Sequence, residues 1–229
     1  MSEAVVNKAL VSSPICCLHC GAVFSGGHFC GTCDRIQPVA PQMDFFSFIG
    51  LPRKLSLDEA DLEKSFYALS RQFHPDYFMS ASDAERQASM ERSSMLNDAY
   101  RTLRDRVARA QYLLSLEGYK EAEKKAPPDL LEEVFELNMQ IEALKAAKKM
   151  ADEDEIAEAV ASLENALTGL RAKLAEIDER LFAQFEQWDS VLEDESVAGE
   201  KKAVLDQMSE LLSRRSYISN LVRDITEVL

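Results

Sequence analysis

Four of the five cysteines form two Cys-x-x-Cys pairs, Cys17/Cys20 and Cys30/Cys33. Each pair predicts a tight turn that presents two thiolates to one ion, and two such turns complete the tetrahedral four-sulfur shell that zinc prefers. Few apolar side chains surround these cysteines, so metal binding is expected to supply most of the folding free energy of the segment. We therefore predict a structural Zn²⁺ ion held by Cys17, Cys20, Cys30 and Cys33.

Two alternatives remain open for this segment. Cys16, His19 or His28 could replace one of the four ligands. A redox or cluster-carrying site would use the same cysteines and would show reactive thiols instead of firmly held zinc. We favour the structural hypothesis, because a closed four-sulfur shell leaves no open position for catalysis. Cysteines crowded into one short segment also do not suggest a disulfide framework.

The second group that could do chemistry is the tripeptide His74-Pro75-Asp76. An imidazole beside a carboxylate is typical of a catalytic base with its orienting group. Catalysis also needs a nucleophile or a metal beside the pair, and a concave site that excludes water. The surrounding sequence offers no serine elbow, no glycine-rich phosphate loop and no third ligand. We therefore predict that the chain is not an enzyme and that this loop serves recognition.

Two amphipathic helical patterns flank the tripeptide. The first is predicted to start at a capping box of Ser56 and Glu59, and it ends where Pro75 removes a backbone donor. The second is predicted to start at a similar box of Ser82 and Glu85. Two helices joined by a short polar loop predict an antiparallel hairpin with the tripeptide at its tip. The apolar faces comprise Leu62, Phe66, Leu69 and Phe73 in the first helix, and Ala88, Met95, Leu96, Ala99, Tyr100 and Leu103 in the second.

Three longer helical patterns follow in the C-terminal part of the chain. Asp129 and Glu132 are spaced as a capping box for the first of them. The next two have apolar residues at alternating steps of four and three, and a polar turn at 193–199 joins them. This periodicity predicts an antiparallel three-helix bundle with coiled-coil-like packing.

The first bundle helix has two apolar stripes. One stripe is enough to dock a helix against its neighbours, so the second predicts a patch on the surface. The other hypothesis is that the helix is buried over a wider arc. The core stripe comprises Leu130, Val134, Leu137, Ile141 and Leu144, and the second stripe comprises Leu131, Phe135 and Met139.

Composition limits the classes of function. The net charge of −14 argues against a nucleic-acid partner, because binding phosphates needs a basic face. No apolar run approaches the length of a membrane span, and the start of the chain has neither a signal nor a transit pattern. We expect an all-α, cytoplasmic monomer. The predicted parts are a disordered tail (1–14), the zinc module with its linker (15–41), the hairpin domain (42–118), a second linker (119–128) and the bundle (129–229).

The sequence around the tripeptide resembles a DnaJ-type J-domain. The segments 66–73, FYALSRQF, and 96–103, LNDAYRTL, flank His-Pro-Asp as they do in such domains. With the segment 109–118, RAQYLLSLEG, and the acidic helical tail, residues 44–229 resemble the HscB-type co-chaperone family of iron–sulfur cluster assembly. The tetracysteine head is similar to the additional zinc module of animal members of that family.

The resemblance implies two protein partners and no catalytic group in this chain. The loop would dock on a DnaK/HscA-type chaperone and stimulate the ATPase of that chaperone, and the bundle would deliver the scaffold IscU to it. J-domains usually carry more positive charge on the helix before the loop, and many have lysine where this chain has Tyr77. A competing hypothesis is a zinc-containing helical adaptor without chaperone-ATPase activity. The implied chaperone-binding residues are His74, Pro75, Asp76, Lys64 and Arg71, and the implied scaffold-binding residues are Leu131, Phe135, Glu136 and Tyr217.

Overall fold

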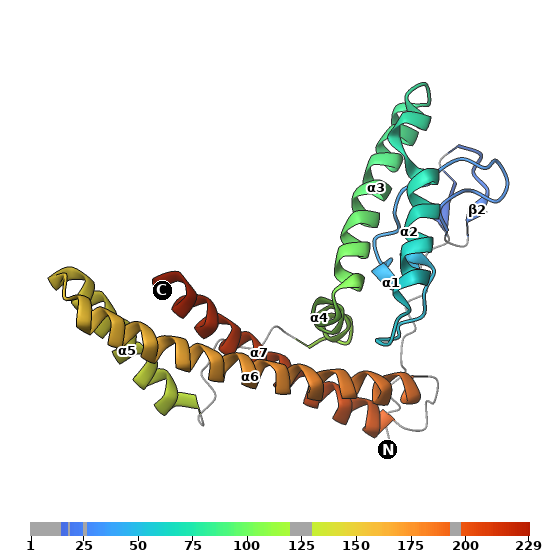
Figure 1. Cartoon of the computed structure of the whole chain (residues 1–229). Helices are drawn as coiled ribbons and strands as arrows, with labels where there is room; N and C mark the ends of the chain where they lie inside the picture. Colours follow the sequence, from blue (N-terminus) through green and yellow to red (C-terminus); the bar gives the residue numbers. More distant parts are fainter. Residues whose placement is uncertain (1–14, 18, 25–26, 120–129, 193–197) are drawn as a thin grey trace, which may run out of the picture. The chain divides into compact units, whose positions relative to one another are not determined.

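The computed structural model describes residues 15–17, 19–24, 27–119, 130–192 and 198–229 (Figure 1). It divides into two compact units, Met1–Pro52 with Asp58–Leu103, and Arg53–Leu57 with Arg104–Leu229. Helices dominate both units, and the described strands are two short pairs of residues in the cysteine segment. The predicted all-α class is therefore confirmed. The predicted domain boundaries stay predictions.

The first unit begins with the cysteine segment, which we call the head (residues 15–38). Strand β1 (Ile15–Cys16) pairs antiparallel with β2 (Val23–Phe24). An isolated bridge joins Phe29 to Ile36 and closes the second cysteine turn. Helix α1 (Phe45–Ile49) follows and ends at Gly50, whose φ of +81° suits a residue without a side chain.

The hairpin of the first unit consists of α2 (Glu59–Phe73), a short 3₁₀ helix η1 (Pro75–Phe78) and α3 (Asp83–Arg104). The predicted box at Ser82 and Glu85 is confirmed, with Ser82 N–H donating to Glu85 Oε2 at 3.2 Å and Glu85 N–H donating to Ser82 Oγ at 3.4 Å. Phe66 stacks on Tyr100 at a centroid distance of 4.3 Å. The fully buried residues of the predicted faces are Leu62, Phe73, Ala88, Leu96, Ala99 and Leu103.

The predicted capping box at Ser56 is wrong. Helix α2 starts one residue after Asp58, whose carboxylate accepts hydrogen bonds from the N–H groups of Ala60 and Asp61. A carboxylate at this position accepts hydrogen bonds from the first free N–H groups and interacts favourably with the positive end of the helix dipole. The N–H of Ser56 instead donates to Asp189 of the second unit, to which residues 53–57 belong.

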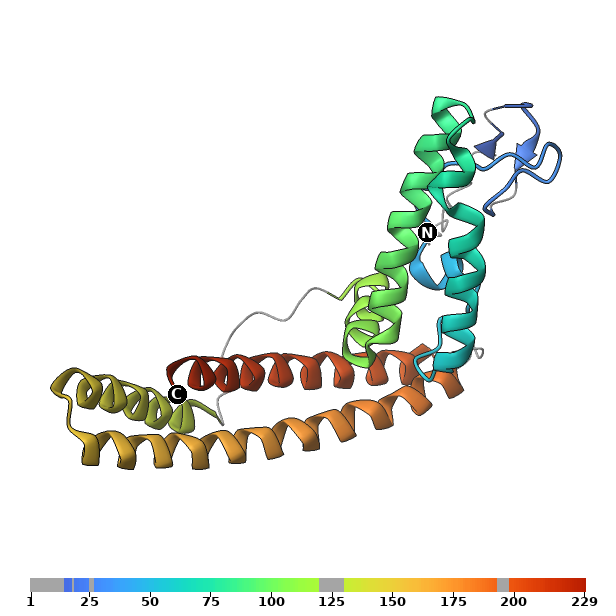
Figure 2. The same ribbon diagram turned by 45° about the horizontal axis from the view of Figure 1, so that its top comes forward.

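The second unit contains α4 (Arg106–Leu116), α5 (Leu131–Met150), α6 (Glu153–Val191) and α7 (Ala198–Val228). Helices α5 and α7 run along α6 in the antiparallel order that the sequence predicts (Figure 2). Asp129, the predicted cap of the first bundle helix, lies outside the described residues. Buried bundle residues include Leu137, Leu144, Leu163, Leu170, Leu181, Phe185, Trp188, Met208, Ile218 and Ile225.

Two details of the bundle core differ from those of a simple three-helix bundle. Helix α7 contacts α4 as well as α5 and α6, and it buries Leu205 and Leu212 in addition to Val204, Met208, Leu211, Ile218 and Ile225. Arg215, a charged residue between Leu211 and Ile218, pairs with Asp178 at 2.5 Å. None of the helices in the described part of the chain combines the length and the hydropathy that a membrane span requires.

Asp189 anchors residues 53–57 to α6. Its two carboxylate oxygens accept hydrogen bonds from the N–H groups of Leu55 at 2.7 Å and Ser56 at 2.8 Å. Because the acceptor is charged, we expect Asp189→Ala to reduce the free energy of unfolding by about 2 kcal/mol. Urea unfolding would measure the loss, with the exposed Glu186→Ala as the control on the same helix. Equal midpoints for the two variants would contradict the anchor.

Candidate functional site

The four predicted ligands come together in the head. The Sγ atoms of Cys17, Cys20, Cys30 and Cys33 all lie within 4.8 Å of one another. The Sγ–Sγ distances are 3.6 Å for Cys17–Cys33 and 3.8 Å for Cys20–Cys30. A tetrahedron with metal–sulfur bonds of about 2.3 Å has edges of about 3.8 Å. The cluster therefore has the dimensions of a four-sulfur metal site.

The backbone around the cluster favours thiolates. The N–H groups of Cys20 and His19 lower the pKa of the Cys17 thiol to about 6. The N–H groups of Thr32 and Cys33 likewise lower the pKa of the Cys30 thiol. Thiolates are the form that binds a metal ion, so the first cysteine of each pair is prepared for one. Burial and the neighbouring cysteines raise the pKa of the Cys33 thiol to about 12, so this thiol would lose its proton when the ion binds.

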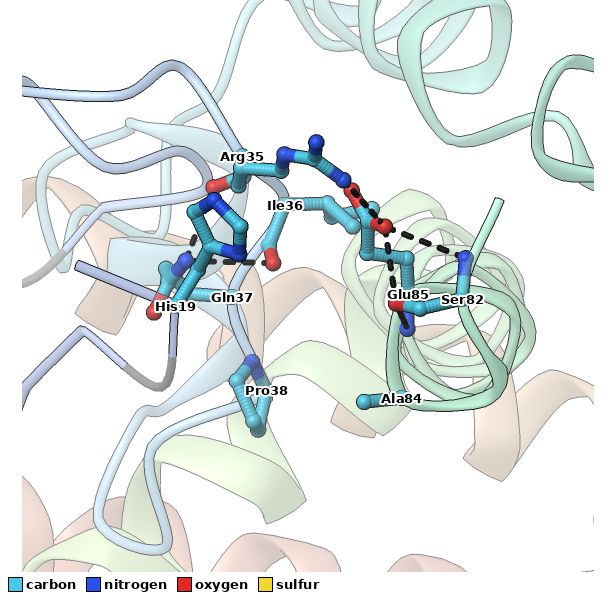
Figure 3. Close-up of a pocket in the computed structure, with 8 residues that line it drawn as sticks. All are labelled: His19, Arg35, Ile36, Gln37, Pro38, Ser82, Ala84 and Glu85. Carbon is cyan, nitrogen blue, oxygen red and sulfur yellow. Dashed lines mark hydrogen bonds and ion pairs between the residues drawn. The ribbon is translucent and has the colours of Figure 1, made fainter.

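The alternative ligands lie outside this four-sulfur group. His28 Nδ1 lies 2.6 Å from Arg92 Nη1, and burial, followed by the charge of Arg92, lowers the pKa of His28 to about 4. Its imidazole is therefore neutral and accepts a hydrogen bond from the guanidinium. His19 lines a small hollow of about 90 Å³ beside Arg35 (Figure 3). Cys16 is exposed on β1.

A metal assay tests the cluster directly. We expect freshly purified protein to contain about one zinc ion per chain, with four thiols that become reactive only after a chelator is added. Cys20→Ser should lose the metal, whereas Cys16→Ser should keep it, because Cys16 is not in the cluster. Reactive thiols in metal-loaded protein would instead support the redox hypothesis.

The His-Pro-Asp loop is exposed at the tip of the hairpin. The side chains of His74 and Asp76 are 52% and 76% exposed. The N–H of Asp76 donates to His74 Nδ1 at 3.3 Å, so the neutral ring has its proton on Nε2. The N–H of Tyr77 donates to the His74 carbonyl at 3.0 Å and closes the turn. The loop thus presents an imidazole and a carboxylate to solvent from a defined backbone.

The residue before the loop is fixed by α3. Phe73 is fully buried, and its carbonyl accepts hydrogen bonds from Ser89 Oγ at 2.7 Å and Ser93 Oγ at 2.9 Å. Sequence periodicity did not single out either serine, since a hydroxyl in a helix most often faces solvent or its own backbone. The two bonds hold the end of α2, where the loop begins, against the second helix.

The predicted basic residues Lys64 and Arg71 are both exposed on α2, with Tyr67 spaced between them on the same face. Acidic residues Glu59 and Asp61 occupy the first turn of this helix. Helix α2, which precedes the loop, therefore carries exposed charges of both signs. Its role in chaperone binding stays a prediction.

The second apolar stripe of α5 is exposed. Leu131, Phe135 and Met139 are 55%, 66% and 60% exposed, whereas Leu137 and Leu144 of the core stripe are buried. The hypothesis of burial over a wider arc is therefore wrong, because one side of α5 packs on the bundle and the other faces solvent. Such a contiguous apolar surface on one helix is typical of a protein-binding site. Of the other predicted scaffold-binding residues, Glu136 is exposed on α5 and Tyr217 is half-buried on α7.

Residues 44–112 match the DnaJ domain, which is the region of α1, the hairpin and most of α4. An exposed His-Pro-Asp turn on such a hairpin defines a protein of the J-domain class. The HscB homologue of Vibrio cholerae (strain M66-2) is 32% identical over 186 residues, which cover 81% of this chain and 96% of the relative. The chain belongs to the HscB family of co-chaperones.

Further HscB proteins are similar to this chain over most of its length. The mouse iron–sulfur cluster co-chaperone protein HscB is 29% identical over 231 residues, covering 98% of this chain and 86% of that protein. The crystal structure of human HscB covers 93% of this chain and 98% of that chain, with 26% identity and a TM-score of 0.67. The structure of HscB from Vibrio cholerae covers 81% and 97%, with 30% identity and a TM-score of 0.55.

Proposed function

We propose that this chain is a co-chaperone of iron–sulfur cluster assembly that stimulates the ATPase of a DnaK/HscA-type chaperone and delivers the scaffold IscU to it. The main support is the exposed His-Pro-Asp turn at the tip of a helical hairpin, in a chain that belongs to the HscB family. The mouse relative is named as an iron–sulfur cluster co-chaperone. For this function the chain would need no catalytic group of its own, because ATP hydrolysis would take place in the partner.

The loop would act by recognition. Pro75 and Asp76 begin the 3₁₀ helix η1 and His74 caps it, so the hydrogen bonds of this turn would reduce the conformational entropy that is lost when the chaperone binds them. Lys64 and Arg71 on α2 would add attraction for an acidic surface of the chaperone. A two-state chaperone responds only to a ligand that binds one of its states better than the other. The loop would therefore favour the hydrolysis-competent state of the chaperone.

The scaffold would bind on the apolar face of α5. Leu131 and Phe135 offer large side chains that lose exposed apolar area when a partner covers them. Glu136 beside them and Tyr217 on α7 would supply polar contacts to the same partner. The α5 surface and the loop belong to different units of the chain.

The metal ion would be zinc with a structural role. Cys17, Cys20, Cys30 and Cys33 would complete its shell, and no position would be left for a substrate. When bound, the ion closes the two turns of a segment that buries few apolar side chains. We further propose that the protein is a cytoplasmic monomer.

Steady-state ATP hydrolysis by the cognate chaperone tests the proposal. We expect the rate to rise when this chain is added and to rise further when the scaffold is also present. The adaptor hypothesis, which the acidic residues in the first turn of α2 favour, predicts binding of another helical protein without any change in ATPase rate. A rate that is unaffected by the chain would therefore support the adaptor.

A further inference from the structure

Arg92 is a buried residue of α3 that belongs to neither proposed binding surface. Its side chain is fully buried, although arginine is rarely found so deep in a protein. Its Nε donates to the Gln37 carbonyl at 2.6 Å, and its Nη2 donates to the Gly27 and Pro38 carbonyls, each at 3.0 Å. Its Nη1 lies 2.6 Å from His28 Nδ1. All of these partners belong to the head.

These acceptors are electrically neutral, so they must all be in place to compensate for the burial of a cation. Burial lowers the pKa of Arg92 to about 10, which leaves the guanidinium charged near neutral pH. If the head unfolds, the guanidinium loses all of these hydrogen bonds at the same time. The burial of Arg92 therefore depends on the folded head.

The acceptors lie on both sides of the second cysteine turn. Gly27 and His28 precede Cys30, and Gln37 and Pro38 follow Cys33. The Gln37 N–H donates to the His28 carbonyl at 3.0 Å, which joins the two sides. A metal ion that binds both cysteines would hold this turn closed and would keep the acceptors in register around Arg92.

The same head residues contact the start of the His-Pro-Asp loop. The His28 ring lies edge-on to Phe73 at a centroid distance of 4.8 Å and to Phe48 at 5.0 Å. Phe73 immediately precedes His74, and α3 holds its carbonyl. The head therefore forms part of the packing that fixes the first residue of the loop.

A second contact lies just after the loop. Arg35 of the head pairs with Glu85 at 2.7 Å, and Glu85 also accepts the hydrogen bonds of Ser82 that start α3 (Figure 3). The head thus contacts the hairpin at Phe73 before the loop and at the capping box after it.

We propose that the metal-bound head braces the His-Pro-Asp loop, with Arg92 as the positioning residue that couples the metal site to the hairpin. The role of this brace in chaperone stimulation rests on the proposed function of the loop, whereas the coupling itself does not. Coupling between two sites is reciprocal, so a change at Arg92 must weaken metal retention if metal binding orders the surroundings of Arg92.

Metal affinity tests the coupling without any chaperone. Protein loaded with cobalt(II) shows thiolate absorption, and the loss of this absorption as the concentration of a competing chelator rises gives the dissociation constant of the metal. We expect Arg92→Met to raise this dissociation constant about fivefold or more. Arg92→Lys keeps the charge and should restore part of the affinity. The control is Arg101→Met, an exposed arginine of the same helix, which should bind the metal with wild-type affinity. Equal dissociation constants for Arg92→Met and Arg101→Met would overturn the proposal.

Hydrogen exchange of the wild-type chain gives a second test that does not depend on a variant folding. Removing the metal should increase amide exchange at residues 76–78 and 85–93, while the core amides of α6 remain protected. Unchanged exchange at 76–78 would overturn the brace. Metal-dependent exchange in a chain that fails to stimulate the chaperone would instead overturn the proposed function and leave the coupling intact.

Discussion

Replacing His74 by glutamine is expected to abolish stimulation of the chaperone ATPase, so that the rate falls to the basal value of the chaperone alone. The side chain of His74 is 52% exposed, and its Nδ1 accepts a hydrogen bond from the Asp76 N–H. Glutamine keeps a polar side chain of similar length but has no ring. It therefore cannot reproduce the planar imidazole that the turn presents with the carboxylate of Asp76.

The variant should fold normally, because His74 is exposed and the side-chain oxygen of glutamine can still accept the hydrogen bond of this cap, so the loss of stability should stay below about 1 kcal/mol. Scaffold binding should be undiminished, since the α5 patch belongs to the other unit. A matched control is His19→Gln, which removes another exposed histidine of the same unit that is not a member of the four-sulfur group. Wild-type stimulation by His74→Gln would refute the proposed role of the loop.

The helical architecture was predictable because it depends on local periodicity. The steps of four and three along α6 and α7 place apolar residues on one side whatever the partner is, and most of these residues are buried. The box at Ser82 and Glu85 is equally local. The wrong prediction for the start of α2 shows where local patterns fail. Asp58 and Ser56 are both residue types that cap helices well, and the hydrogen bond of the Ser56 N–H with Asp189, which holds Ser56 outside the helix, is a long-range contact.

The cysteine cluster was predictable for a similar reason, since the spacing within each pair fixes where the sulfurs lie. His28 was a reasonable alternative ligand because it lies two residues from Cys30. Its true surroundings, which are Arg92, Phe48 and Phe73, come from segments far away in the sequence. No local pattern marks Arg92 as buried, because its neighbours on α3 are largely polar. Long-range contacts of this kind become visible only in the three-dimensional structure.

The last prediction concerns the apolar face of α5. We expect Leu131→Ala and Phe135→Ala to weaken binding of the scaffold by about 1–3 kcal/mol each, if these side chains are anchors that the partner buries. Both are more than half exposed in the free chain, so truncating them should leave the core of the bundle intact. Isothermal titration calorimetry would measure the affinity, and the double variant would show whether the two losses add.

Met150→Ala provides the matched control, because Met150 is 77% exposed at the far end of the same helix and lies outside the proposed patch. It should bind the scaffold as the wild-type chain does. The α5 variants should still stimulate the chaperone in the absence of scaffold, and should lose only the further rise that scaffold produces. Since His74→Gln is expected to show the opposite pattern, the two sets of variants separate the loop from the bundle. Undiminished affinity of the α5 double variant would place the scaffold elsewhere on the chain.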